Sequence, residues 1–567
     1  MNGTLIQIEC PLRQRTRYAA AQSRLRWLRA QLSRPLLPSL PDGPTGTVQR
    51  IGIGITFAMM VMYVAILLRY VVLLHHTYQT PAEDLGIMDQ VLWNTVHGHF
   101  WQETICNSVS DMNCLAGTSR WGIHFEPLML ALVPVYALFP GVQTLQFVQI
   151  AGVALGAIPA YLLGSRRLGH AAGGVVLAAI YLIMPVLRVA VIDDFHMVTL
   201  AAPLLMLALY ALYLRNDRLL IIACILAMGT KEQVPLDVFM VGVAALVLQR
   251  RPRIGLIVMA LAVAWIVVAL GVIHMVSPLG ASPTAARYHG VLGTLRRLPL
   301  VLHDPLRRTY INTLLDNTGQ LGLFAPWVLM LAMPSILLNA LSSLPNQYSG
   351  LFQYNADIAP LLVLATLEGM VVIAAGTRFV AHWLCHWRRW PLRTMPFVQQ
   401  VLGVFLVLFA LNMHLLPTNL TTLNPMTLGS WPHATAHTQL AQRFIAQVPK
   451  LAPVSAQSDI VPHLSERPEI YQYPDGVADS DYILLDFDDG FYPEPDEATY
   501  TNSVKSILQS GLFTVLDADD GYVLLRATPT PQKATPVTLP LQFCPHLPLT
   551  EPLDTARINT LVPCYPT

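Results

Sequence analysis

Long runs of apolar residues are the feature that most constrains this chain. Residues 51–74 have the sequence IGIGITFAMMVMYVAILLRYVVLL, and several later runs are of similar character. A run of about 20 such residues crosses roughly 30 Å of hydrocarbon. The chain must satisfy its own backbone hydrogen bonds there, so each run is expected to be helical. Only 12% of the 567 residues are charged, about half the usual share, and the mean hydropathy is +0.48. The sequence therefore predicts an α-helical polytopic membrane protein.

Roughly 10–13 membrane segments are expected. Residues 125–139 are apolar but too short to span, which predicts a re-entrant or peripheral segment. Residues 219–248 are interrupted by Lys231, Glu232 and Asp237 and have basic residues on both flanks. That pattern predicts a hairpin of two short membrane segments with Lys231 and Glu232 at its turn. Breaks at Pro326 and Pro334 are expected in the region 319–344. The remaining predicted spans are 142–163, 171–191, 197–214, 254–276, 358–375 and 401–416.

Charge is distributed unevenly between the two ends of the chain. Residues 1–50 contain eight arginines and two acidic residues, Glu9 and Asp42. Positive flanks remain on the cytoplasmic side, so this segment is expected to be a cytoplasmic arm rather than a nucleic-acid-binding one. From Leu451 onward the chain contains seventeen acidic and five basic residues, and no apolar run is long enough to span a membrane. We therefore expect three parts: the arm 1–50, a transmembrane domain 51–417 with an outer loop 75–124, and an extracytoplasmic domain 418–567.

The C-terminal part is predicted to be a small α/β domain. Residues 440–448 have a helical pattern, whereas 481–487, 512–516 and 522–527 resemble strands. The acidic stretch DFDDGFYPEPDE lacks the spacing of an EF-hand loop, so no metal site is predicted there.

The seven cysteines follow the same division. Cys106 and Cys114 lie in the first outer loop, and Cys544 and Cys564 lie in the C-terminal domain. Disulfides persist in oxidising compartments, so these four residues are expected to form two local pairs. The other three cysteines fall in segments predicted to lie inside the cell or in the membrane: Cys10, Cys224 and Cys385.

The stretch EDLGIMDQVLWNTVHGHFW, residues 83–101, follows closely on the first span. Its apolar residues recur every three to four positions, which predicts an amphipathic helix at the membrane surface. Asp84 precedes this helix, so it is either the helix N-cap or a functional carboxylate.

Polar residues gather at the predicted outer turns. Charges that border hydrocarbon are costly, and one explanation is a functional site. Each has a simpler explanation when taken alone: a turn for Asp193 and Asp194, or a lysine reaching the headgroups for Lys231. All of these residues fall on the predicted outer side of the membrane, which predicts one cavity at the outer leaflet. The residues concerned are Asp84, Asp89, His124, Glu126, Asp193, Asp194, His196, Lys231, Glu232, Gln353 and Tyr354.

Several long motifs carry a family resemblance. They are DLGIMDQVLWNTVHG, HFEPLMLALVPVYALFP, DDFHMVTLAAPLLMLALYAL, KEQVPL and LLNALSSLPNQYS, in this order. From about Tyr70 into the C-terminal domain, the chain resembles the bacterial membrane-protein family DUF2079. That family in turn resembles the GT-C superfamily of glycosyltransferases, which use polyprenyl-phosphate sugars. In HFEPL, Phe-Glu stands where the superfamily's His-Pro-Pro-Leu-like motif has one of its prolines.

The resemblance implies a multi-pass protein of the plasma membrane that transfers a sugar from a polyprenyl-phosphate carrier to an acceptor at the outer face. It implies Asp84 as the general base, with Asp89 as the second candidate. Lys231 would bind the phosphate, assisted by Arg188 or Arg287. His124, Glu126, Asp193 and His196 would orient sugar or acceptor, or bind a divalent metal; no other cofactor is expected.

The sequence is also compatible with two other functions. A transporter or flippase would show internal repeats and broken helices that meet at the bilayer midplane, and no clear repeat is visible. A non-catalytic receptor or assembly factor would act through its acidic C-terminal domain. No P-loop, nucleophile elbow or zinc-type spacing of His and Cys appears, so the sequence does not support an ATPase or a hydrolase.

Overall fold

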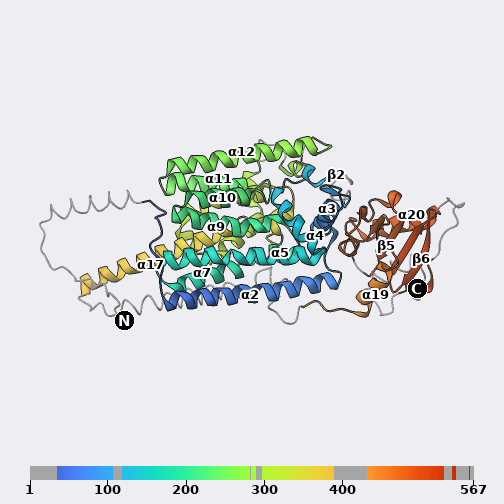
Figure 1. Cartoon of the computed structure of the whole chain (residues 1–567), viewed down its shortest axis with the longest axis horizontal. Helices are drawn as coiled ribbons and strands as arrows, with labels where there is room; N and C mark the ends of the chain where they lie inside the picture. The colour runs from blue at the N-terminus through green and yellow to red at the C-terminus, as the bar shows by residue number, and fades with distance from the viewer. Residues whose placement is uncertain are drawn as a thin grey trace.

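The computed structural model shows a helical bundle with a sheet-containing domain at one end (Figure 1). The helices of the bundle run roughly parallel to the long axis of the molecule, and the C-terminal domain lies beyond the short helices that follow α2 (Thr47–His76). The structure describes residues 35–105, 118–280, 282–288, 296–388, 431–488, 490–528, 539–544 and 561.

Five described helical segments are long and apolar enough to cross a membrane, and six if α7 and α8, bent by 43° at Met184, count as one. The chain is therefore a multi-span membrane protein, but the expected 10–13 segments overestimate the full-length spans among the described residues, because several are short or broken. The predicted span 401–416 lies outside the described residues. The bundle helices are α2, α5 (Val142–Leu155), α6 (Ala157–Arg167), α7 (Ala171–Ile183), α8 (Pro185–Asp193), α9 (Ala201–Leu214), α10 (Asp217–Met228), α11 (Pro235–Val243), α12 (Pro252–Val276), α16 (Pro326–Leu341) and α17 (Ala359–Arg388).

The interrupted segments show how polar residues enter the bundle. α10 and α11 form the predicted hairpin, with Lys231 and Glu232 in the turn between them. Residues 125–139 hold only the short helices η3 (Pro127–Leu132) and α4 (Val133–Leu138). The break predicted at Pro334 is wrong, since α16 continues through this proline to Leu341. Packed neighbouring helices allow a proline within a membrane helix.

Side-chain exposure matches a helical bundle in lipid. The outer helices α2 and α12 present large apolar side chains to the surroundings, including Phe57 and Val267. α9, by contrast, is buried along most of its length. Helices α6 and α7 pack closely at Gly164, where an added Cβ would lie only 2.8 Å from the Gly173 carbonyl oxygen. Small residues of this kind allow membrane helices to approach.

The C-terminal domain is built on a five-stranded mixed sheet of order β4-β3-β5-β7-β6. β3 pairs in parallel with β4 and β5, and the hairpin of β6 and β7 adds antiparallel strands. α19 packs against one face and α20 against the other. The predicted helix and strands are thus confirmed. The elements are α19 (Ala436–Ile445), α20 (Glu497–Ser510), β3 (Val454–Ala456), β4 (Ile470–Gln472), β5 (Tyr482–Asp486), β6 (Phe513–Asp519) and β7 (Tyr522–Ala527).

One hydrophobic core joins the two parts of the molecule. Tyr78, Ala82 and Ile105 of the first loop pack in the same cluster as residues of α19, β3 and β5. At the end of α2 the ring of His75 stacks on that of His463, with centroids 3.9 Å apart. The C-terminal domain is therefore docked on the loop that contains Asp84, and this docking brings residues of both parts to the candidate site.

Candidate functional site

Asp84 lies in a tight turn that precedes helix α3. The turn η1 (Ala82–Gly86) is π-helical by its hydrogen bonds, but Asp84 itself has φ 68° and ψ −76°. These angles are close to those of a γ-turn, which is rare and strained for a residue with a side chain. α3 (Ile87–Val96) begins after Gly86, and no side chain caps it. The N-cap interpretation of Asp84 is therefore wrong, because the turn carries the carboxylate away from the helix end.

His196 is the direct partner of Asp84. Its Nε2 lies 2.7 Å from Oδ2 of Asp84, whose side chain is 34% exposed. The backbone N–H of His196 donates to Oε1 of Gln149 at 2.6 Å, and Nδ1 lies 3.2 Å from the carbonyl oxygen of Asp194. The imidazole is therefore held by α5 and by the end of α8, and its other nitrogen is directed at Asp84.

Cations around Asp84 control its protonation. Burial favours the neutral acid, but His196, Arg120 and Lys231 together lower the pKa of Asp84 below its ordinary value. Burial likewise opposes charge on His196, and the neighbouring Asp84 raises the pKa of the imidazole. Each side chain thus favours the charged form of the other, and a carboxylate in this position can accept a proton or orient a cationic or hydroxyl group.

Lys231 supplies a buried positive charge near Asp84. Lys231 is only 7% exposed. Its charge influences the pKa values of Asp84, His196 and Glu232. Among the described residues, no carboxylate oxygen lies within 4.0 Å of its ammonium nitrogen. A buried ammonium of this kind is suited to an anionic ligand such as a phosphate.

Arg287 and Tyr354 complete one side of the site. Arg287, Asp84 and Asp193 are electrostatic neighbours of the Tyr354 hydroxyl. Burial is the main reason that the pKa of Tyr354 is raised to about 12. Gln353, on the same 3-10 turn, is buried next to α8. The structure thus brings these sequence candidates together with Asp84.

His124 and Glu232 form a second pair at the hairpin turn. His124 Nδ1 lies 2.7 Å from Glu232 Oε1, and the backbone N–H of Phe125 donates to Glu232 Oε2 at 3.3 Å. Burial opposes ionisation, but His124 and Lys231 lower the pKa of Glu232 to about 2. This pair fixes the HFEP segment against the turn that carries Lys231.

Arg120 is a site residue that the sequence did not single out. It is 5% exposed, and its guanidinium lies 3.6 Å from Glu103 and 3.7 Å from Glu126. Neither contact is a hydrogen bond, since Nε of Arg120 and Oε2 of both glutamates have no hydrogen-bond partner among the described residues. Burial raises the pKa of Glu103 to about 7 despite Arg120. The only sequence signal was an arginine four residues before HFEP; the short strands β1 (Gln102–Glu103) and β2 (Thr118–Ser119) bring the group together.

Three candidates face other parts of the structure. Asp89 is fully buried and accepts hydrogen bonds from Tyr136 at 2.7 Å and Ser465 at 2.6 Å. Arg188 is buried within the bundle near Tyr63 of α2. Asp194 lines a cavity behind the site.

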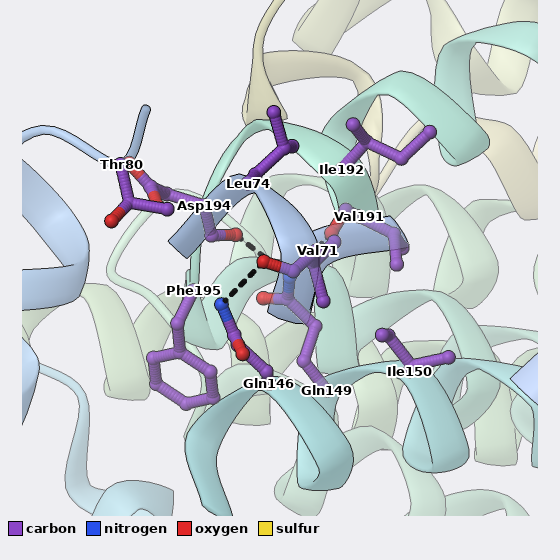
Figure 2. Close-up of a pocket in the computed structure, with 10 residues that line it drawn as sticks. All are labelled: Val71, Leu74, Thr80, Gln146, Gln149, Ile150, Val191, Ile192, Asp194 and Phe195. Carbon is purple, nitrogen blue, oxygen red and sulfur yellow. Dashed lines mark hydrogen bonds between the residues drawn. The ribbon is translucent and has the colours of Figure 1, made fainter. Parts of the chain in front are cut away.

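That cavity has a volume of about 10 Å³ (Figure 2). Gln146 and Gln149 of α5 line it together with Asp194, and Gln149 donates to the Asp194 carbonyl oxygen at 2.7 Å. Oε1 of Gln146 is buried and has no hydrogen-bond partner within the part of the chain that the structure describes. The volume is that of about one water molecule, so the cavity is too small for a sugar.

The described residues contain no group of three His, Cys, Asp or Glu side chains that could hold a metal ion. Cys544 is disulfide-bonded, and Cys224 is a buried free thiol. Cys106, Cys114 and Cys564 lie outside the described residues.

Comparison with protein families decides the relationship that the motifs suggested. The model of the family DUF2079, described as a predicted membrane protein, matches residues 74–524. The chain belongs to the DUF2079 family. Comparison with curated proteins gives no match.

Two solved structures of ArnT from Cupriavidus metallidurans are similar to this DUF2079 protein. The form bound to undecaprenyl phosphate has 14% sequence identity and a TM-score of 0.48, with 83% of this chain and 98% of the other covered. The apo form has 14% identity and a TM-score of 0.43, with coverages of 84% and 99%.

Proposed function

We propose that this protein is a membrane glycosyltransferase that moves a sugar from a polyprenyl-phosphate carrier to an acceptor hydroxyl. The observation that supports the proposal best is the Asp84–His196 pair, at 2.7 Å, in electrostatic reach of the buried Lys231. A base and a phosphate-binding cation are the two groups that this reaction needs, and they come from widely separated parts of the chain. The outer face of the membrane is the side that the Arg-rich arm predicts for this site.

In the proposed reaction, the acceptor oxygen attacks the anomeric carbon and its proton passes to the Asp84 carboxylate. The bond between the anomeric carbon and the phosphate oxygen breaks, and its electron pair leaves with the phosphate. Lys231, aided by Arg287, stabilises the charge that develops on the leaving group. His196 holds Asp84 in its ionised form, and Tyr354 and Gln353 contact the sugar or the acceptor.

Two separate His–carboxylate pairs lie in the site. The nitrogens of His196 and His124 each face a carboxylate separately, so the described side chains do not converge on one point.

The test is sugar release from a panel of polyprenyl-phosphate sugars by the purified full-length chain in lipid nanodiscs. Wild type is expected to consume at least one donor, and Asp84→Asn is expected to remove that turnover. If wild type consumes none of the donors, the proposal fails, and transport or a scaffold role becomes the better explanation.

Lys231 provides a second measurement. Lys231→Met should raise the KM for the donor about tenfold or more, because a buried charge-assisted contact with the phosphate is lost. Lys231→Arg, which keeps the charge, is the matched variant. Its donor KM should lie between the values of wild type and Lys231→Met. An unchanged donor KM in Lys231→Met would remove this residue from the phosphate site.

A further inference from the structure

The turn that presents Asp84 has a conformation that its own sequence does not favour. The φ and ψ angles of Asp84 are strained for a residue other than glycine, and such a conformation persists only when surrounding contacts enforce it. The neighbours of the turn therefore show what holds the proposed base in place.

The C-terminal domain contacts both ends of the turn. Ala82, the first residue of η1, donates its backbone N–H to Oγ of Ser458 at 3.2 Å, and both residues are buried. At the other end, a Cβ added to Gly86 would lie 3.3 Å from Cγ1 of Val461. Between them, the Tyr492 hydroxyl donates to Oε1 of Glu83 at 2.8 Å.

The segment that makes these contacts is itself fixed to the membrane domain. Val461 begins the short helix η12 (Val461–His463), and His463 stacks on His75 at the end of α2. The position of Ser458 and Val461 is thus set relative to the bundle that carries His196.

Resting on the proposed function, we infer that Ser458 and Val461 of the C-terminal domain are positioning residues that hold the strained turn so that Asp84 faces His196. The domain thereby completes the active site and is more than a docking module. Misplacement of a reacting group by about 1 Å can lower the rate on the order of 100-fold. Contacts that hold the turn at both ends should therefore increase the rate of transfer.

Ser458 can be tested without undocking the domain. Independent contacts hold the domain elsewhere: Ser465 donates to Asp89, and Thr104 donates to the Ile470 carbonyl oxygen at 2.6 Å. Ser458→Ala should therefore leave the domain bound but release the Ala82 amide. Ser455→Ala is the matched control, because the buried Ser455 hydroxyl donates to the Asp475 carbonyl oxygen within the same domain.

The experiment measures amide hydrogen exchange of the full-length protein in nanodiscs, together with kcat and KM. In Ser458→Ala, peptides covering 82–86 should exchange about tenfold faster, as expected for loss of one buried hydrogen bond. The value of kcat should fall about tenfold while the donor KM is unchanged, because only the placement of the base is affected. Ser458→Thr, which keeps the hydroxyl, should restore both values, and Ser455→Ala should match wild type at residues 82–86.

The exchange rate and kcat of Ser458→Ala test different parts of the inference. Unchanged exchange at 82–86 in Ser458→Ala would overturn the role of Ser458 in holding the turn. Faster exchange with unchanged kcat would overturn its importance for the reaction. If wild type itself transfers no sugar, the proposed function fails, whereas the exchange measurement still decides whether Ser458 holds the turn.

Discussion

Asp84 and Asp89 lie five residues apart, yet their carboxylates face different parts of the molecule. Asp84 sits on the strained turn, about one-third exposed, and meets His196 from the bundle. Asp89 lies in α3, is fully buried, and meets Tyr136 of α4 and Ser465 of the C-terminal domain.

The two environments shift the pKa in opposite directions. Near Asp84, neighbouring cations outweigh burial and lower its pKa. At Asp89, burial outweighs the hydrogen bonds of Ser465 and Tyr136 and raises the pKa to about 7. The comparison shows that the same stretch supplies one carboxylate for proposed chemistry and another for holding the domain. Side-chain type alone does not separate these roles, since the surroundings determine them.

The largest expected effect is a difference in kcat between variants of Asp84 and of Asp89. Asp84→Asn is expected to lower kcat about 10³-fold, a typical loss for a general base, whereas Asp89→Asn should stay within about tenfold of wild type. Asparagine is the right substitute at position 84, because it tolerates a positive φ better than most residues. Initial rates of sugar release measure both variants. An equal loss in Asp89→Asn would mean that Asp89 shares the catalytic role.

A smaller effect concerns the pH dependence of Asp84. His196 lowers the pKa of Asp84, so His196→Gln should raise it and move the acidic limb of the kcat/KM profile to higher pH. A displacement of one pH unit reduces the rate about tenfold below the limb.

His437→Gln is the control for that measurement. His437 lies in the C-terminal domain, where its ring nitrogens face Asp486 and Asp520. Its substitution should leave the acidic limb in place. A limb that does not move in His196→Gln would show that His196 does not control the ionisation of Asp84.

The smallest effect concerns the stability that Asp89 contributes. Its pKa is about 7 in the folded protein and 3.8 ordinarily, so the folded state binds the extra proton between these values. The contribution is fully present below about pH 4 and is lost as the pH rises through 7. The Tm of wild type should therefore fall by a few degrees from pH 5 to 8 relative to Asp89→Asn, which does not titrate.

Thermal unfolding in nanodiscs at several pH values provides the measurement. Glu103 also has a pKa raised to about 7, but it is present in both proteins, so the difference between them isolates Asp89. Parallel curves for the two proteins would show that Asp89 is ionised in the folded state.

Local pattern was sufficient for much of the fold. Apolar runs located α2, α9 and α12, and the interruption at Lys231 and Glu232 located the turn between α10 and α11. Short strand-like apolar runs located β5 and the hairpin of β6 and β7. These features depend on neighbours within one segment, so the sequence by itself determined them.

The composition of the candidate site depended on contacts between distant segments. Asp84 reaches His196 from another part of the chain, and Arg120 meets Glu103 only because β1 and β2 pair. The strained turn is held by Ser458, 376 residues from Ala82. The sequence by itself determined that the chain spans a membrane several times, which segments form strands of the sheet and to which family the chain belongs. Only the tertiary structure decided which carboxylate faces a cation and which is buried, because a pKa and a strained turn depend on groups that folding brings together.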